Sequence, residues 1–386
     1  MEINNKTKIK ITIKTFYGFE NVLVDELKEL NYEPIAVLNR AVQVSGNWHD
    51  IYFLNLHLRC AISILAELAV FSIKSERDLY LKTKQIKWDE IFSFNKTIAV
   101  KGAVFSDIFR NTQYPLLLVK DAVVDVFREK YGKRPDVSTS KPEILLDLYV
   151  RNNLITLSLN TSGAPLFQRG YRKEKGLAPL NEVVAACLLR MSGWDKKTPF
   201  LDPFCGSGTI LVEAALLSSG LPSNLERPYY AFKNLLNYNP DLWASIYDKI
   251  DKRQLKLPVP IIGSDNSDSM VIKARRNVRC FSFARNLDIQ VKSFDSIKNN
   301  DEPYFILTNP PYGERMGEDI DVLYESIGNW LKTNMVGSDF WMISSNMEAY
   351  KNIGLKHANK VKVFNGNIEC SFRKFEIYEG TRKNNS

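Results

Sequence analysis

The first 65 residues alternate between strand-like and helix-like spacing of apolar positions. Strand-like runs occupy 8–15, 36–38 and 41–44, and a helical pattern runs over 22–30. The short runs 51–54 and 62–65 fit helix more easily than strand. Ile9, Ile11 and Ile13 share one face of the first run, as in a half-buried strand. The pattern predicts a small α+β module.

A second α+β module follows over about residues 60–160. A strand at 97–100 precedes a helix at 116–130, whose buried stripe includes Val119 and Val123. Two further apolar runs are separated by a short polar turn, which predicts a β-hairpin. These runs occupy 144–150 and 154–159.

The remainder of the chain shows strands separated by helical patterns. Leu201-Asp202 runs through a glycine-rich turn into the apolar stretch 210–217, and 259–265 is another strand that ends in an acid. Strands with acids and glycines at their carboxyl ends predict a doubly wound α/β domain. Asn365-Gly366, between two alternating runs, predicts a closing antiparallel hairpin on the mostly parallel sheet.

The tetrapeptide Asn309-Pro310-Pro311-Tyr312 follows the apolar run 304–307. An amino group conjugated to a nucleobase ring is a poor nucleophile, so a protein that alkylates it must hold the base and accept the amine hydrogens. The Asn309 side-chain oxygen and the Pro310 carbonyl are two such acceptors, and proline stiffens the turn. Tyr312 offers an aromatic face for an unstacked base. The alternative is a turn that ends the strand and has no catalytic role.

A second set of residues has the pattern of a nucleoside-like ligand site. Gly206 and Gly208 allow backbone to approach a ligand closely, and no lysine follows them as in a P-loop. Asp202 ends the strand before this turn. Asp265 suits both hydroxyls of a ribose. Asp295, after the strand-like residues 289–291, is either an acceptor for an adenine amino group or a solvated loop residue.

Composition and net charge exclude only a few classes of function. The net charge of +8 permits an anionic partner such as RNA. Four basic residues near aromatic side chains suit phosphates and unstacked bases, or else form a solvated, charged surface: Arg110, Lys120, Arg169 and Arg172. The five cysteines form no C-x-x-C pair, which argues against disulfides and zinc and fits the cytoplasm. We expect no secretory signal, membrane span or metal.

Several motifs occur along this chain in the same order as in one known family. They are Phe109–Tyr114, Val119–Asp125, Arg169–Arg172, Ala178–Glu182 and Asn309–Arg315. With them the sequence resembles the THUMP-domain RNA guanine-N2 methyltransferases, and in particular the N-terminal half of the bifunctional bacterial 23S rRNA enzyme.

The resemblance implies a ferredoxin-like domain at 1–58, a THUMP RNA-binding domain at 59–160, and a linker with a Rossmann-like class I methyltransferase domain at 161–382. S-adenosylmethionine is the implied cofactor, held by Asp202, Gly206, Gly208, Asp265 and Asp295. Asn309, Pro310 and Tyr312 are the implied catalytic residues. The implied reaction is direct transfer to the N2 amine of one flipped guanosine in 23S rRNA. Because the second catalytic half is absent from this sequence, we expect one modification.

Three other functions remain open from the sequence. A tRNA guanine-N2 methyltransferase is one, because THUMP domains also occur on tRNA enzymes. An adenine-N6 DNA methyltransferase is another, since the Asn-Pro-Pro-Tyr motif also serves adenine amines. A non-catalytic RNA-binding factor is the third, and the glycine turn together with the Asn309 motif argues against it.

Overall fold

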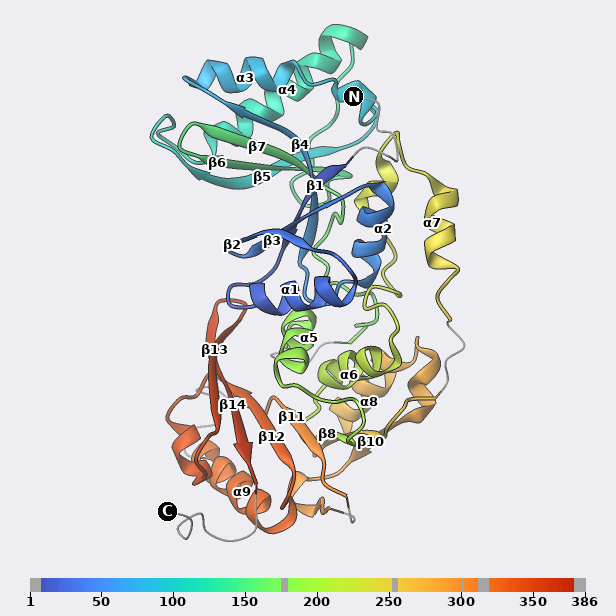
Figure 1. The fold of residues 1–386 in the computed structure, drawn as a ribbon, viewed down its shortest axis with the longest axis vertical. Helices are drawn as coiled ribbons and strands as arrows, with labels where there is room; N and C mark the ends of the chain where they lie inside the picture. The colour runs from blue at the N-terminus through green and yellow to red at the C-terminus, as the bar shows by residue number, and fades with distance from the viewer. Residues whose placement is uncertain (1–7, 175–179, 252–255, 300–301, 312–318, 378–386) are drawn as a thin grey trace. The chain divides into compact units, whose positions relative to one another are not determined.

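The computed structural model describes residues 8–174, 180–251, 256–299, 302–311 and 319–377, which form two compact units. The first unit comprises residues 8–15, Leu23–Gln168 and Arg227–Lys249; the second comprises Phe16–Val22, Arg169–Glu226 and 250–377. Each unit is built on its own seven-stranded sheet (Figure 1).

The first sheet has the strand order β2-β3-β1-β4-β7-β6-β5. Its strands are β1 (Ile9–Lys14), β2 (Pro34–Leu38), β3 (Ala41–Gly46), β4 (Ser63–Ser72), β5 (Ile98–Phe105), β6 (Ile144–Arg151) and β7 (Leu154–Asn160). The accompanying helices are α1 (Glu20–Glu29), α2 (Trp48–His57), α3 (Glu76–Lys84), α4 (Tyr114–Tyr131) and the short η1 (Trp88–Glu90). The predicted strands, the helix at 116–130 and the β6–β7 hairpin are confirmed.

The helix expected at 62–65 is wrong, because this segment begins the long strand β4. Ser63–Ala66 pair with β1 and Leu65–Ser72 pair with β7, so β4 joins the two predicted modules into one sheet. A short apolar run does not distinguish a helix from a central strand, and pairing on both sides decides the outcome here. Figure 1 shows α3 and α4 lying on one face of the β4–β7 half.

The segment between the predicted strands at 200 and 260 leaves the second unit and packs in the first. It contains η2 (Ala231–Asn234) and α7 (Pro240–Tyr247). The Tyr52 ring on α2 lies 4.4 Å from Phe232 and 6.2 Å from Trp243, measured between ring centroids. The Tyr52 hydroxyl also accepts a hydrogen bond from the backbone N–H of Asn239 at 3.1 Å.

The second sheet has the order β10-β9-β8-β11-β12-β14-β13. Its strands are β8 (Phe200–Asp202), β9 (Ile261–Asp265), β10 (Leu287–Val291), β11 (Phe305–Thr308), β12 (Asp339–Ser344), β13 (Asn359–Asn365) and β14 (Ile368–Glu376). The first five in spatial order are parallel, while β14 is antiparallel to both β12 and β13. The predicted doubly wound sheet with a closing hairpin is confirmed.

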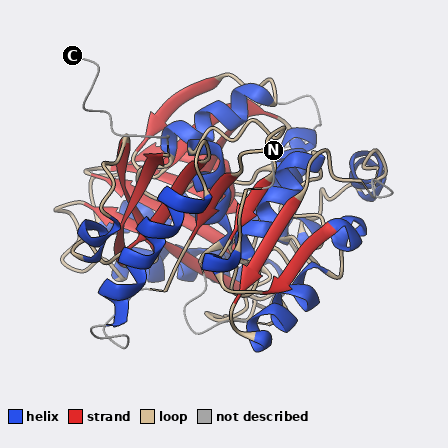
Figure 2. Cartoon of the chain, turned by 90° about the horizontal axis from the view of Figure 1, so that it is seen from below, coloured by secondary structure: helices blue, strands red, loops and turns tan. Residues whose placement is uncertain are grey.

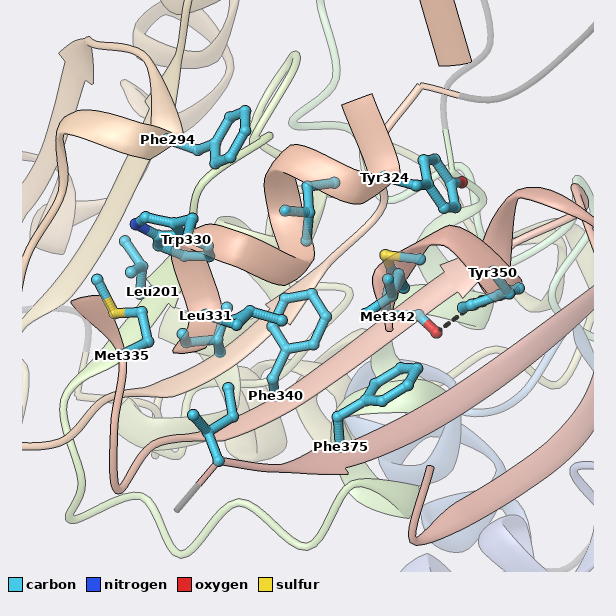
Figure 3. Close-up of a cluster of buried hydrophobic side chains, with 14 of the residues drawn as sticks. Leu201, Phe294, Tyr324, Trp330, Leu331, Met335, Phe340, Met342, Tyr350 and Phe375 are labelled. Carbon is cyan, nitrogen blue, oxygen red and sulfur yellow. Dashed lines mark hydrogen bonds between the residues drawn. The ribbon is translucent and has the colours of Figure 1, made fainter. Parts of the chain in front are cut away.

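Seven helical segments of the described chain accompany this sheet, and Figure 2 distinguishes the helices of the chain in blue from the strands in red. They are α5 (Glu182–Met191), α6 (Thr209–Ser219), α8 (Asp268–Val278), α9 (Asp319–Asn334), η3 (Ser282–Asn286), η4 (Phe294–Ser296) and η5 (Ala349–Ile353). On the α9 face, Trp330 and Leu331 pack in a buried cluster with Leu201 and Phe340 (Figure 3). On the other face α6 approaches so closely that a Cβ on Gly263 would lie 2.2 Å from a Leu211 methyl carbon.

Candidate active site

The carboxyl ends of four neighbouring parallel strands each lead into one predicted site residue. In the sheet order β10-β9-β8-β11, these residues are Asp295, Asp265, Asp202 and Asn309. In an open α/β sheet, ligands bind at this end of the strands. The fold therefore brings the four predicted residues to one edge of the sheet, although they are far apart in the sequence.

The glycine turn between β8 and α6 is held in a backbone conformation that favours glycine. Gly206 has φ +52° and Gly208 has φ +84°. A Cβ on Gly208 would also lie only 3.1 Å from the Cβ of Ala274 on α8. Both glycines are thus required by the turn itself, which carries the chain directly into the buried helix α6.

Asp265, at the end of the neighbouring strand β9, stabilises this turn through hydrogen bonds. Its Oδ2 accepts a hydrogen bond from the Gly206 N–H at 3.0 Å, and its Oδ1 accepts one from the Ser267 N–H at 2.9 Å. A carboxylate has about four acceptor positions. Two positions therefore remain for the two hydroxyls of a ribose, so the carboxylate fits the predicted role while already being fixed in place.

Asp202 is 1% exposed and hydrogen-bonded on one oxygen. Its Oδ1 accepts from the Thr308 hydroxyl at 2.7 Å and from the Phe204 N–H at 3.2 Å. Burial raises the pKa of Asp202 to about 7; the two hydrogen bonds oppose this rise and the nearby charge of Asp265 adds to it. The Thr308 bond also ties β8 to β11 immediately before Asn309.

Asn309 carries the most informative atom of the site. Its Oδ1 is buried and has no hydrogen-bond partner among the described residues. A buried acceptor left without a donor costs about 1–3 kcal/mol, which is why native structures rarely leave one. Pro310 beside it is buried and stiffens the turn. Tyr312 lies outside the described residues.

Asp295 lies on η4, and its side chain is exposed while its neighbour Phe294 is buried. It follows β10 at the same edge of the sheet as the other acids, but no hydrogen bond joins it to them in the described chain. The two interpretations of Asp295 made from the sequence therefore both persist.

Two of the four predicted phosphate-binding residues have a structural role instead. Arg169 is 1% exposed, and its guanidinium pairs with Glu213 at 3.3 Å and donates to Asn224 at 3.0 Å. Arg172 pairs with Glu182 at 3.1 Å and donates to the Thr209 hydroxyl at 2.8 Å. These pairs could not be inferred from the basic cluster in the sequence, because both carboxylates lie on helices further along the chain. Arg172 thereby fixes the first residue of α6, directly after the glycine turn.

The other two basic residues lie in the first unit. Arg110 is exposed between β5 and α4, where a phosphate contact is open to it. Lys120 on α4 is partly buried and pairs with Asp121 at 2.6 Å.

Sequence reasoning missed Thr308 although a signal was present. Thr308 is 0% exposed and is the one polar residue in the otherwise apolar strand 305–308, directly before Asn309. A buried hydroxyl needs a partner, and Asp202 supplies it. Cys205 beside the glycine turn is also buried, and burial raises the pKa of its thiol well above its usual value. The thiol is therefore a poor nucleophile.

The described ranges contain neither a metal-binding cluster nor a membrane-spanning helix. No cluster of three or more His, Cys, Asp or Glu side chains has an arrangement that would hold a metal ion. In the same part of the chain, no helix has both the length and the apolar character to cross a membrane.

The fold and the site define a Rossmann-like class I methyltransferase domain, whose cofactor is S-adenosylmethionine. Residues 169–374 match the family model described as RMKL-like, methyltransferase domain, and the chain belongs to this family. Residues 10–65 match the RlmL ferredoxin-like domain and 74–160 match the THUMP domain. The predicted order of ferredoxin-like, THUMP and methyltransferase domains is thus confirmed, and the predicted boundaries between them remain predictions.

Relatives and a solved structure agree with this assignment. The ribosomal RNA large subunit methyltransferase K/L of Marinomonas sp. (strain MWYL1) is 33% identical over 95% of this chain, which spans about half (52%) of that relative's length. A putative RNA methyltransferase of Synechocystis sp. is 32% identical, covering 94% of this chain and 95% of its own. A putative methyltransferase, SMU.472, solved with S-adenosylhomocysteine, superposes with a TM-score of 0.84 at 25% identity, over 97% of this chain and all of that one.

Proposed function

We propose that this protein methylates the exocyclic N2 amine of one guanosine in 23S ribosomal RNA. The observation that carries the proposal is the Oδ1 of Asn309 at the end of β11, which is buried and has no hydrogen-bond partner among the residues that the structure describes. It lies directly after Thr308, whose hydroxyl donates to Asp202 at the end of β8. An acceptor placed there suits an amine that enters next to the cofactor.

The N2 amine of guanine has two hydrogens and a lone pair shared with the ring. The Asn309 oxygen and the Pro310 carbonyl accept those hydrogens, orient the lone pair and stabilise the positive charge that develops on nitrogen. The proton of the methylated amine then leaves to water, because it becomes acidic once the new bond forms. Tyr312 is proposed to stack on the flipped base.

The cofactor supplies a methyl group already activated by its sulfonium charge. Gly206 and Gly208 let the backbone approach it, Asp265 is proposed to accept from its ribose hydroxyls, and Asp295 from its adenine amino group. Asp202 is buried beneath the turn and holds it against β11. Positioning is therefore the main contribution of the protein to the rate.

RNA as the substrate is supported by the match of residues 74–160 to the THUMP domain and by the names of the relatives. The choice of 23S rRNA over tRNA rests on the Marinomonas relative and on the motif set quoted above. We propose a cytoplasmic protein on the same grounds.

The test is radiolabelled methyl transfer to total RNA from a strain that lacks this gene, followed by nucleoside analysis. We expect label as N2-methylguanosine in 23S rRNA. Label in tRNA would keep the chemistry and replace the substrate. Label in duplex DNA without label in RNA would favour an adenine-N6 methyltransferase, and absence of transfer to any nucleic acid would overturn the proposal.

A further inference from the structure

An arginine-lined hollow of ≈ 900 Å³ lies on the second unit, away from the strand ends described above. The end of α8, the turn η3 and the start of β10 form its walls. The polar lining residues are Arg275, Arg279, Ser282, Arg285, Asn286 and Asp288.

Two of the three arginines are available to a ligand. Arg279 and Arg285 are exposed, and no ion pair or hydrogen bond joins their guanidinium groups to a described residue. Arg275 instead donates through Nε to the Ile289 carbonyl at 3.2 Å and so stabilises the wall at the open edge of the sheet. The one carboxylate of the lining, Asp288, accepts from Gln290 at 2.6 Å. The lining therefore keeps a positive charge.

The hollow is separate from the candidate cofactor site. In the parallel pairing of β10 with β9, Leu287 lies opposite Ile261 and Val291 lies opposite Asp265. The hollow involves Leu287–Ile289, at the beginning of the strands, whereas Asp265 ends its strand.

The chemistry of the lining favours a phosphodiester backbone over a nucleobase. Guanidinium groups bind phosphate oxygens through two parallel N–H donors. A base would also need an aromatic face, but the one ring in the lining, Phe281, is 5% exposed and stacks on Phe283 at 4.8 Å. The geometry points to this hollow as a contact for the sugar-phosphate backbone of the substrate RNA, distant from the base that is methylated. The inference rests on the proposed function.

The experiment compares the full chain with the double variant Arg279→Gln/Arg285→Gln. Lys356→Gln/Lys360→Gln is the matched control, because it removes two exposed charges, one just before β13 and one in it, at the opposite edge of the same sheet. Filter binding to a labelled 23S rRNA transcript, and to an unrelated RNA of equal length, is measured from 50 to 300 mM KCl. Calorimetry with S-adenosylhomocysteine checks that the cofactor site is intact.

We expect the arginine variant to bind both RNAs roughly tenfold more weakly at low salt, with the slope of log K against log [KCl] smaller by about 1.5, since each lost phosphate contact contributes ~0.7–0.9. The lysine variant and the cofactor affinity should match the wild type. If wild-type protein binds and methylates RNA while the arginine variant has an unchanged dissociation constant and slope, this inference is overturned and the proposed function stands. A loss confined to the 23S transcript would overturn it too. Wild-type protein that neither binds nor methylates RNA would overturn both.

Discussion

The two ends of the parallel strands in the second sheet differ in how their polar side chains are exposed. At the carboxyl ends of the strands, Asp202 and Thr308 are buried and bonded to each other. The side-chain oxygen of Asn309 is buried there too, and no residue in the described part of the chain donates a hydrogen bond to it. Near the amino-terminal ends of the strands, where the hollow lies, Arg279 and Arg285 are exposed.

This difference separates a site for a small, oriented group from a surface for a polyanion. Burying polar groups costs free energy, so a fold retains them where a ligand completes their hydrogen bonds. Exposed arginines cost little and act through charge, which salt screens. Removal of single atoms should therefore have large effects at the strand ends, and removal of charges should have graded, salt-dependent effects at the hollow.

The largest effect is expected for Asn309→Ala. Removing the acceptor should lower kcat by about 10²–10³-fold, the range found when one preorganised hydrogen-bonding group is deleted from an active site. The affinity for S-adenosylhomocysteine should stay within about threefold, because the change lies on the proposed base side. Single-turnover transfer to RNA and calorimetry measure the two quantities. Near-normal turnover would remove Asn309 from the proposed role.

The next largest effect is on stability, for Asp202→Asn. The folded pKa of about 7 lies above the usual value of 3.8, so the folded state binds the proton more tightly than the unfolded state. Stability from this group is fully present below pH 3.8 and is lost as the pH rises to 7. Asparagine keeps the acceptor without the charge. The variant should therefore gain stability between pH 4 and 7, up to roughly 3–4 kcal/mol, with a plateau above pH 7.

Urea denaturation of the cofactor-free chain at several pH values checks the Asp202 prediction. Asp195→Asn is the matched control with the opposite sign. The Thr198 and Lys197 N–H groups lower the pKa of Asp195, so it stabilises the fold above its unfolded pKa and loses this effect as the pH falls. If both variants responded to pH in the same direction, the buried-charge interpretation of Asp202 would be wrong.

The same contrast explains how much of the molecule could be predicted from sequence. The parallel strands and the strand-end residues follow from local patterns, because an acid after an apolar run is visible in the chain itself. Three-dimensional pairing is not visible in the chain. The apolar pattern predicts helix where β4 begins, and the basic cluster predicts an RNA contact for Arg169 although Glu213 pairs with it. The hollow lined by Arg279 and Arg285 could not be predicted, because it forms only where α8, η3 and β10 pack together.

A smaller effect is expected for Asp265→Asn on cofactor affinity. An amide keeps one oxygen, but its NH₂ group cannot accept from the Gly206 N–H that now bonds to Oδ2, or from a ribose hydroxyl. Loss of charged hydrogen bonds of this kind costs about 1.5–3 kcal/mol, so the dissociation constant for S-adenosylhomocysteine should rise roughly 10–100-fold. Asp268→Asn, three residues on in the first turn of α8, is the control and should bind normally. Unchanged affinity in Asp265→Asn would exclude the ribose assignment.

The smallest effect at the strand ends is expected for Thr308→Val, which keeps the side-chain shape and removes the hydroxyl that donates to Asp202 at 2.7 Å. Because this bond holds β8 beside β11, its loss should lower kcat by about 5–10-fold, whereas Thr308→Ser should restore most of it. The discriminating measurement is a double-mutant cycle with Asp202→Ala, which removes the acceptor of this bond, followed in kcat and in the free energy of unfolding. If the two residues act through their shared bond, the second substitution adds less than it does alone, with an interaction energy of roughly 0.5–3 kcal/mol. Additive effects would mean that Thr308 only fills space in the strand, and the strand ends would then be less tightly coupled than their burial implies.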